Sequence, residues 1–213
     1  MHSETKLLVG SSVILSIAIT ALVVLPYLQE ERRKPPSALR PYTDQQLRGR
    51  QVYIENGCIA CHSQQPRTRA QAPDFERGWG RAPVAADYYY DKPILLGTMR
   101  TGPDLFNIGA RQPSVDWHLG HLYQPRAYTA GSIMPAYPFL FERKAKAETG
   151  ETLVNLPPAF APKGEVVVAK PAAMDLVAYL LALDHTYALD DIPSLPVPAP
   201  TNPAPAPAPA GGV

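Results

Sequence analysis

The chain has 213 residues, which is enough for one domain of modest size together with additional segments. Its hydrophobic fraction of 46% is enough for a real core, and its formal net charge of +1 gives no reason to expect a nucleic-acid partner. Proline is unusually frequent, with 25 residues, many of them close to the C-terminus. The composition therefore favours a single domain with extra segments and argues against the nucleic-acid-binding class.

An uncharged and mostly apolar stretch runs from Leu7 to Leu28. A helix of this length spans roughly 33 Å, and the hydrocarbon core of a bilayer is about 30 Å thick. The alternatives are a cleaved signal peptide, whose apolar stretch would be about 7–15 residues long, and a buried soluble helix, which would have a polar face. We predict that residues 1–28 form a single transmembrane anchor.

Residues 29–42 are charged and rich in proline, and we interpret them as a short stalk. A helix is predicted over residues 43–57, because Thr43 and Gln46 form the pattern of a capping box. This helix leads directly into the two cysteines of the chain.

Cys58 and Cys61 stand three residues apart and are followed at once by His62, in the sequence CIACH. The C-x-x-C-H pattern is typical of c-type haem attachment. Two thiols at this spacing reach the two vinyl groups of one porphyrin, and the next histidine is held beneath the iron. A zinc site would need further ligands, and a redox-active cysteine pair would need a thioredoxin-like βαβ pattern. We predict one covalently bound haem c, with its iron ligated by His62.

The second axial ligand is expected to be a methionine or a histidine, and methionine would raise the reduction potential. Met174 lies in a predicted C-terminal helix and is more simply a core residue. Met99 precedes a stretch that we expect on the same side as His62. Met134 lies far beyond the motif, in the proline-punctuated loop SIMPAYPF. We predict Met134 as the ligand; the alternative is a packed methionine.

Two further positions are candidates for contact with the haem. The carbonyl oxygen of Pro103, in the sequence GPDL, is a candidate acceptor for the Nδ1–H of His62, a bond that would orient the imidazole. Arg100 and Arg111 are close enough in sequence to neutralise the haem propionates, although arginines in loops are commonly just solvated. Of the two, we retain Arg100 as a candidate.

Residues 63–132 are rich in proline, glycine and tyrosine and are interpreted mainly as loops. The best helix in this region is predicted over residues 114–123, starting from a serine cap. His118 and His121 share one face of it. They have no third ligand at an obvious spacing, so packing and hydrogen bonding around the haem is the simpler interpretation.

The remainder of the chain is predicted to contain one hairpin, one helix and one tail. The β-branched sequence GEVVVAK is expected to pair with TLVNL. Pro171 is expected to open a final helix, AAMDLVAYLLALD. Residues 192–213 are rich in proline and alanine, and we expect either a solvated tail or a segment that packs along a partner subunit.

The Gly49–Tyr53 pair, CIACH, GPDL, a loop methionine and the LVAYL helix together resemble the single-haem cytochrome c fold. The resemblance implies that the first and last helices of the domain cross, with Gly49, Tyr53 and Tyr179 at the crossing. It also implies a mostly α fold class: a single N-terminal transmembrane helix followed by a class I cytochrome c domain, residues 43–191, with long loop insertions.

Four longer segments occur in order within residues 5–141: GRQVYIENGCIACHSQQPR, YYYDKPILLGTMRTGPDLFNIG, DWHLGHLYQPR and SIMPAYPFL. Together they are similar to the mono-haem cytochrome c subunit (subunit II) of cbb-three-type, or C-family, haem–copper cytochrome c oxidases. The resemblance implies that Cys58 and Cys61 hold the haem and that His62 and Met134 ligate its iron.

The resemblance further implies a non-catalytic subunit that passes electrons from a donor cytochrome c to a haem–copper catalytic subunit in aerobic respiration. A second cytochrome c subunit is a further candidate partner. The alternatives are a tethered electron shuttle, a subunit of another respiratory complex such as nitric oxide reductase, and an assembly protein with a structural haem.

The orientation in the membrane rests on two signals that disagree. Arg32, Arg33 and Lys34 follow the apolar stretch and only Lys6 precedes it, so the positive-inside rule places the domain in the cytoplasm. The haem motif argues the opposite, because c-type haem is attached outside the bacterial cytoplasmic membrane. Long domains translocate largely regardless of flanking charge. We therefore expect a single-pass protein of the inner membrane with its haem domain on the periplasmic side.

Overall fold

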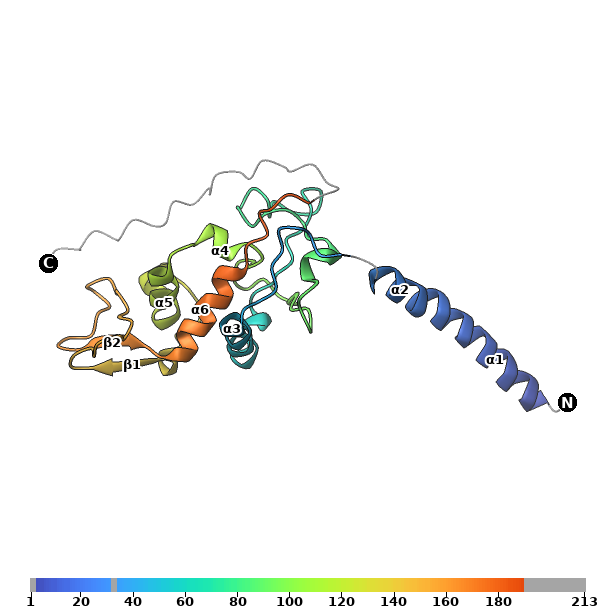
Figure 1. The fold of residues 1–213 in the computed structure, drawn as a ribbon, viewed down its shortest axis with the longest axis horizontal. Helices are drawn as coiled ribbons and strands as arrows, with labels where there is room; N and C mark the ends of the chain where they lie inside the picture. The colour runs from blue at the N-terminus through green and yellow to red at the C-terminus, as the bar shows by residue number, and fades with distance from the viewer. Residues whose placement is uncertain (1–2, 32–33, 190–213) are drawn as a thin grey trace.

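The computed structural model describes residues 3–31 and 34–189, and the predicted tail at 192–213 lies outside them. This part of the chain is mostly helical, with one two-stranded sheet (Figure 1). The helices are α1 (Ser3–Ile19), α2 (Leu25–Glu31), α3 (Asp44–Glu55), α4 (Ile108–Arg111), α5 (Val115–Tyr123) and α6 (Pro171–Ala182); the strands are β1 (Phe141–Lys144) and β2 (Val166–Ala169). The mostly helical class predicted from the sequence is confirmed.

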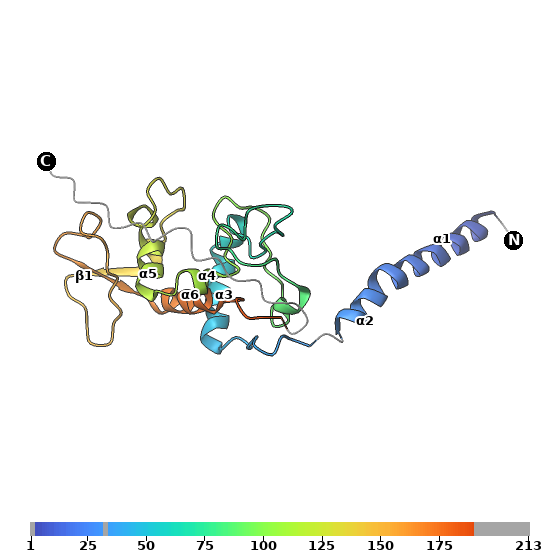
Figure 2. The same cartoon turned by 90° about the horizontal axis from the view of Figure 1, so that it is seen from above.

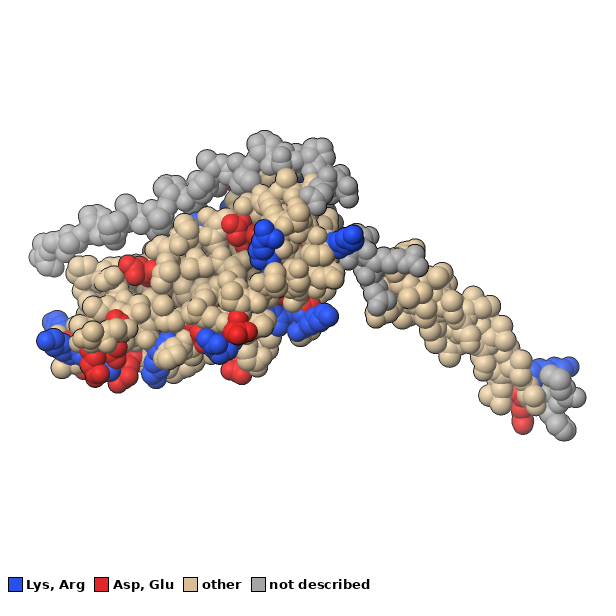
Figure 3. All heavy atoms as spheres, in the orientation of Figure 1, with Lys and Arg blue, Asp and Glu red and all other residues tan. Residues whose placement is uncertain are grey.

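The N-terminal helix projects away from the rest of the chain (Figures 1 and 2). It runs from Ser3 to Gln29, 27 residues, and its most apolar 18-residue window has a mean hydropathy of 2.5 and is not buried within the protein. On the face seen in Figure 3, the charged atoms drawn on this helix lie at its N-terminal end. Its length and composition fit a single-pass membrane anchor.

The helix continues past a proline by changing its hydrogen-bond pattern. Thr20–Val24 form a π-helical turn between α1 and α2, in which the backbone N–H of Leu25 donates to the carbonyl of Thr20. Pro26, the next residue, has no N–H to donate, and a local π turn is one way in which a helix accommodates such a break. The helix ends at Glu31, so the first residues of the predicted stalk are helical.

Helix α3 begins at the predicted capping box. The Thr43 side chain accepts from the backbone N–H of Gln46, and the Gln46 side chain accepts from the backbone N–H of Thr43 at 2.8 Å. After Glu55 the chain reverses at Gly57, whose φ of 65° lies in the left-handed region that favours glycine. This turn delivers the chain into the CIACH sequence.

Helices α3 and α6 cross in contact, as Figures 1 and 2 show from two sides. A Cβ atom on Gly49 would lie 1.8 Å from the backbone oxygen of Asp175, so only glycine permits this approach. The rings of Tyr53 and Tyr179 meet edge to face, with centroids 5.5 Å apart. The crossing expected at these residues is therefore present.

The main apolar core lies around this crossing and extends to α5 and β2. Its most deeply buried side chains come from α3, α5, α6 and β2 and include Tyr53, Leu119, Val167, Leu176, Val177 and Tyr179. Helix α6 begins at Pro171, as predicted. Its apolar stripe faces this core because Leu176, Val177 and Leu180 lie at helical spacing.

The strand pairing predicted from the sequence is present in part, but the main partner of β2 is a different segment. Strand β2 pairs antiparallel with β1, and Phe141 lies opposite Ala169. The predicted partner, TLVNL, also pairs with β2, through an antiparallel bridge between Leu153 and Val168 and backbone hydrogen bonds from Val154 to Val167 and from Ala169 to Thr152, so the predicted pairing is present in part. In β1 the side chain of Phe141 is buried against the ring of Tyr123, and in TLVNL the side chain of Val154 is buried while that of Leu153 is exposed.

Candidate haem-binding site

The CIACH sequence forms one compact turn after α3. Cys58–Ala60 is a single 3₁₀ turn, and the backbone N–H of His62 donates to the carbonyl of Cys58 at 2.9 Å. Both cysteines are free thiols, with Cys58 half-buried and Cys61 exposed. The turn therefore presents two thiols and an imidazole from one short piece of backbone.

His62 is oriented by the segment predicted to lie beside it. Its Nδ1 lies 2.8 Å from the carbonyl oxygen of Pro103. A carbonyl only accepts, so Nδ1 donates and Nε2 keeps its lone pair. Burial lowers the pKa of His62, which favours the neutral imidazole that ligates metals. The hydrogen bond expected between these two residues is present, and it makes Nε2 available for an iron.

The GPDL segment packs against the haem motif through close backbone contacts. The N–H of Gly102 donates to the carbonyl of Cys61 at 2.9 Å, and the N–H of Leu105 donates to the carbonyl of Ser63 at 2.8 Å. A Cβ atom on Gly102 would lie 2.3 Å from Cε1 of His62. A side chain at position 102 would thus push the imidazole away from its position.

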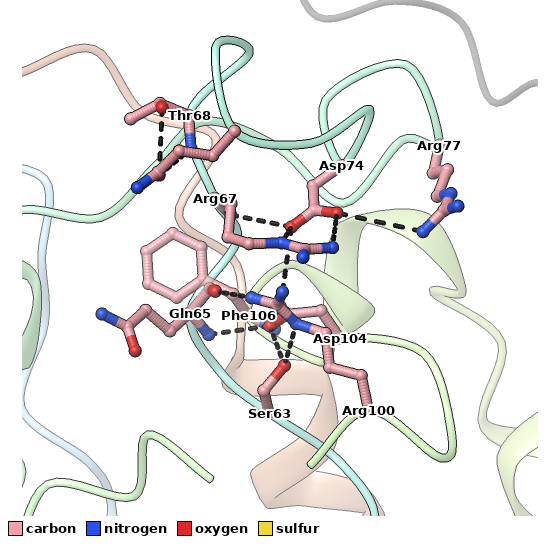
Figure 4. A network of polar contacts seen from close by, with 10 residues as sticks. Ser63, Gln65, Arg67, Thr68, Asp74, Arg77, Arg100, Asp104 and Phe106 are labelled. Atoms are coloured by element: carbon pink, nitrogen blue, oxygen red, sulfur yellow. Dashed lines mark hydrogen bonds and ion pairs between the residues drawn. The ribbon is translucent and has the colours of Figure 1, made fainter. Parts of the chain in front are cut away.

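Arg100 points into a network of protein groups rather than away from the chain (Figure 4). Its Nε donates to the hydroxyl of Ser63 at 2.8 Å, and its Nη2 donates to the carbonyl of Gln65. Its Nη1 lies 3.5 Å from a carboxylate oxygen of Asp74. These contacts do not test the predicted contact with the haem propionates, but they give the guanidinium three partners inside the protein.

Two buried carboxylates complete this network, and sequence reasoning missed both. Asp74 receives the side chain of Arg67 through two hydrogen bonds of 3.0 and 3.1 Å. Burial acts to raise the pKa of Asp74, but hydrogen bonds from Arg67 and the charge of Arg100 outweigh it and lower the pKa. Asp104 accepts from the Ser63 hydroxyl at 2.6 Å. For Asp104 burial prevails and raises the pKa.

The network fixes the chain that follows His62. Asp104 also accepts from the backbone N–H of Gln65 at 2.7 Å. Ser63 and Gln65 are therefore each bonded to Asp104 and to Arg100. The position of Asp104 directly after Pro103 is the one signal in the sequence that points to its role.

Met134 lies half-buried against the core cluster. Its loop is tied to α5, because the N–H of Tyr137 donates to the carbonyl of Leu122 at 3.0 Å. Burial raises the pKa of Tyr137 to about 12, with contributions from the fields of Cys58 and Cys61, which places this loop near the CIACH turn. The assignment of Met134 as an iron ligand stays a prediction.

The other two methionines differ from Met134 in their surroundings. The side chain of Met99 is 58% exposed. Met174 lies in α6 and packs against the core cluster, where the sequence suggested it would be a core residue.

Helix α5 brings its two histidines into different surroundings. His118 Nε2 is 2.9 Å from the carbonyl of Gln112, and the ring of His121 stacks on Trp117 with centroids 4.5 Å apart. Burial lowers the pKa of both histidines to about 4. The fields of His118 and His62 contribute to the shift at His121, so His121 lies on the side of α5 that is near the haem motif.

The family model described as "Cytochrome C oxidase, mono-heme subunit/FixO" matches residues 2–160, which include the haem motif, Pro103 and Met134. The chain belongs to the FixO family. Among curated proteins, no match is found. As a FixO member, the chain is a cytochrome c oxidase subunit that takes part in electron transfer, and the resemblance stated from the sequence is confirmed. Helix α6 lies beyond the matched residues.

The residues of this FixO chain fit the single haem that its family name implies. Two free thiols and an oriented imidazole come from one turn. In addition, the buried side-chain nitrogen and oxygen atoms that have no hydrogen-bond partner among the described residues include Nη1 of Arg111 and Nδ1 of His121. A guanidinium nitrogen only donates and unpaired buried donors are rare in folded proteins, so a bound group with acceptors suits Nη1 of Arg111.

Proposed function

We propose that this chain is a membrane-anchored c-type cytochrome in a cbb-three-type cytochrome c oxidase. It accepts electrons from a donor cytochrome c and passes them to the haem–copper catalytic subunit in aerobic respiration. The observation that supports this most directly is the His62–Pro103 hydrogen bond beside two free thiols. Membership of the FixO family supports the oxidase as the partner.

Each residue of the site has a stated role in this proposal. Cys58 and Cys61 would hold the porphyrin through thioethers, and His62 and Met134 would ligate its iron. The haem supplies one-electron redox chemistry, and methionine ligation gives the high potential that an oxidase donor needs. Pro103 holds the imidazole in one orientation and increases its basicity.

In this proposal the chain consists of an anchor (1–28), a stalk (29–42), a cytochrome c domain (43–191) and a tail (192–213). The anchor crosses the bacterial inner membrane once and leaves the domain on the periplasmic side. A tether of this kind keeps the domain near the catalytic subunit at an effective concentration on the order of millimolar. A second cytochrome c subunit is a candidate neighbour in the complex.

The test is mild solubilisation of the membranes, isolation of the chain and difference spectroscopy of whatever copurifies. We expect haem c together with haem b and a large subunit with several membrane spans, in a complex that consumes oxygen. Haem c without a partner would instead indicate a tethered shuttle, and nitric oxide consumption would indicate another respiratory complex. Absence of haem c would contradict the proposal.

The ligand assignment is tested by a matched pair of variants. Met134→Ala is expected to remove the methionine–iron absorption band and to lower the reduction potential, because a neutral sulfur ligand is lost. Met99→Ala changes the same residue type at an exposed position and is expected to leave both unchanged. The reverse pattern would assign Met99 as the ligand.

A further inference from the structure

An open pocket of about 470 Å³ lies beside the chain that leaves the haem motif. One wall comes from the stretch 63–68, which follows His62, and the facing wall comes from Gly97, Thr98 and Arg100. The two stretches lie in close contact, because a Cβ atom on Gly97 would be 2.5 Å from the carbonyl oxygen of His62. Neither the two cysteines nor the proposed axial ligands line this pocket, so it is separate from the proposed haem ligands.

The charged side chains that line the pocket are all positive. Arg67 and Arg100 form part of its walls, and no carboxylate among the described residues does. The side chain of Asp74 is fully buried. Asp104 is also buried, where it accepts from the hydroxyl of Ser63 at 2.6 Å. A pocket with basic walls and no acidic one favours a negatively charged ligand.

The buried carboxylate of Asp74 holds guanidinium groups in place (Figure 4). It accepts from Nε and Nη2 of Arg67 at 3.1 and 3.0 Å, and nitrogens of Arg100 and Arg77 lie 3.5 and 3.9 Å from it. Three guanidinium groups therefore share this carboxylate. The side chain of Arg67 is still 44% exposed, and its two bonds to Asp74 do not use Nη1. A guanidinium fixed along one edge can bind a ligand at the other with little loss of conformational freedom.

Neutral donors line the same pocket. Oε1 of Gln71 accepts from the backbone N–H and the hydroxyl of Thr68, at 3.3 and 3.1 Å. Because the amide oxygen is engaged in this way, Nε2 is the atom that Gln71 can offer to a ligand. The exposed side chain of Thr98 adds a hydroxyl from the facing wall. Charged and neutral donors around one pocket suit a ligand whose oxygens carry several lone pairs.

We propose that this pocket is a binding site for an oxyanion, either a carboxylate or a phosphate group. Arg67 supplies charge-assisted hydrogen bonds, Arg100 adds its positive charge, and Gln71 and Thr98 donate to the remaining oxygens. The site does not require the proposed haem, because all of these groups belong to the polypeptide. The oxyanion comes either from solution or from a neighbouring subunit, and the experiment separates these two sources.

The first measurement is calorimetric titration of the isolated full-length protein, in detergent, with inorganic phosphate against sodium chloride of the same ionic strength. We expect saturable binding of one phosphate. Arg67→Gln is expected to bind phosphate at least about tenfold more weakly, because a hydrogen bond between charged groups is lost. Arg69→Gln is the matched control, because Arg69 does not line the pocket and forms an exposed ion pair with Glu76. Its phosphate affinity should equal that of the wild type.

A second pair of variants leaves the contacts of Asp74 unchanged. Thr98→Glu introduces a carboxylate at the pocket, which should compete with phosphate for the arginines and abolish binding. Thr98→Gln has nearly the same size without the charge and is expected to retain binding. If Arg67→Gln does not accumulate, this pair decides, and equal binding by the two Thr98 variants would contradict the site.

The source of the oxyanion is found by repeating the titration on the intact complex, with the Arg67→Gln complex as the reference. Phosphate binding in the complex would indicate an anion from solution. Binding to the isolated chain alone would indicate that a carboxylate of a neighbouring subunit fills the pocket. Absence of saturable binding to the isolated wild-type protein, or equal binding by Arg67→Gln, would overturn the proposal.

Discussion

At the scale of single residues, the site depends on places where two segments of backbone nearly touch. Gly49 lies against the backbone of α6, and Gly102 lies against the imidazole of His62. Both contacts exist because glycine has no Cβ atom. Buried carboxylates, such as those of Asp74 and Asp104, also fix the loops around the haem motif.

Gly49→Ala is expected to destabilise the domain by about 3 kcal/mol, because overpacking forces the crossing helices apart. The added Cβ would meet the backbone of Asp175 at 1.8 Å and the Cβ of Tyr179 at 2.9 Å. Helix propensity alone predicts that alanine stabilises α3 relative to glycine by roughly 0.5–1 kcal/mol. A loss of stability would therefore identify overpacking as the cause. Denaturant unfolding measures it, with the exposed Gln45→Ala in α3 as the control. A stabilised Gly49→Ala protein would contradict the observed crossing.

Asp74→Asn is expected to cost about 1–3 kcal/mol of stability. The carboxylate is fully buried and faces Arg67 and Arg100, so its loss leaves their charges without a partner. Glu165→Gln is the control, because its ion pair with Arg143 is exposed and such pairs contribute about 0–1 kcal/mol. Equal losses in the two variants, measured by urea unfolding, would show that the buried network has no special role.

At the scale of elements, α5 holds the loop of Met134 in place and carries two histidines. It is capped by Ser114, whose side chain accepts from the N–H of Trp117 at 3.2 Å. Its C-terminal half binds the methionine loop through the carbonyl of Leu122, and its face carries His118 and His121. Changes in the charge of this helix should therefore alter the stability of the whole site.

His118 predicts a pH dependence of stability. Burial lowers its folded-state pKa to about 4 from an ordinary value of 6.5. Below pH 6.5 the unfolded chain takes up a proton that the folded chain does not bind until about pH 4. Stability should therefore fall as the pH falls through this window, by up to about 1.4 kcal/mol per pH unit.

The measurement is the urea midpoint at several pH values between 7 and 4. In His118→Gln this contribution is absent. The slope of the unfolding free energy against pH should therefore be smaller by the contribution of one bound proton. His121 titrates in the same window and stays in the variant, so part of the slope should remain. Identical slopes in the two proteins would mean that His118 titrates normally in the folded state.

At the scale of the whole molecule, the protein combines an exposed apolar helix with a domain that has its own core. The most apolar part of the helix from Ser3 to Gln29 is not buried against any other part of the described chain. The domain is closed by the contact between α3 and α6, which lie far apart in the sequence. The two parts therefore do not depend on each other for their packing.

A chain that begins at residue 34, exported behind a cleavable signal peptide so that haem attachment outside the membrane can still occur, is expected to leave the membrane fraction and to remain soluble, because it lacks the apolar helix. Its covalent haem and its reduction potential should match those of the full protein, since the residues of the site all lie after the cut. Fractionation with detection of haem c measures both properties. A truncated protein that still sediments with membranes would reveal a second attachment, such as a partner subunit.

Features that depend on neighbours along the chain could be predicted from the amino-acid sequence. The apolar helix, the Thr43 capping box, the Ser114 cap and the Pro171 start are set by residues within a turn or two of each other. The CIACH turn belongs to the same group, because its two thiols and its histidine lie on one short stretch.

Only the tertiary structure decided which distant segments meet. It made β1 the main partner of β2, with the side chain of Phe141 packed against the ring of Tyr123, and limited the pairing of TLVNL to one bridge and two backbone hydrogen bonds. It likewise gave Arg100 three protein partners and left Arg111 with an unpaired nitrogen. Long-range pairing and burial depend on how the whole chain packs, and a local pattern does not contain that information.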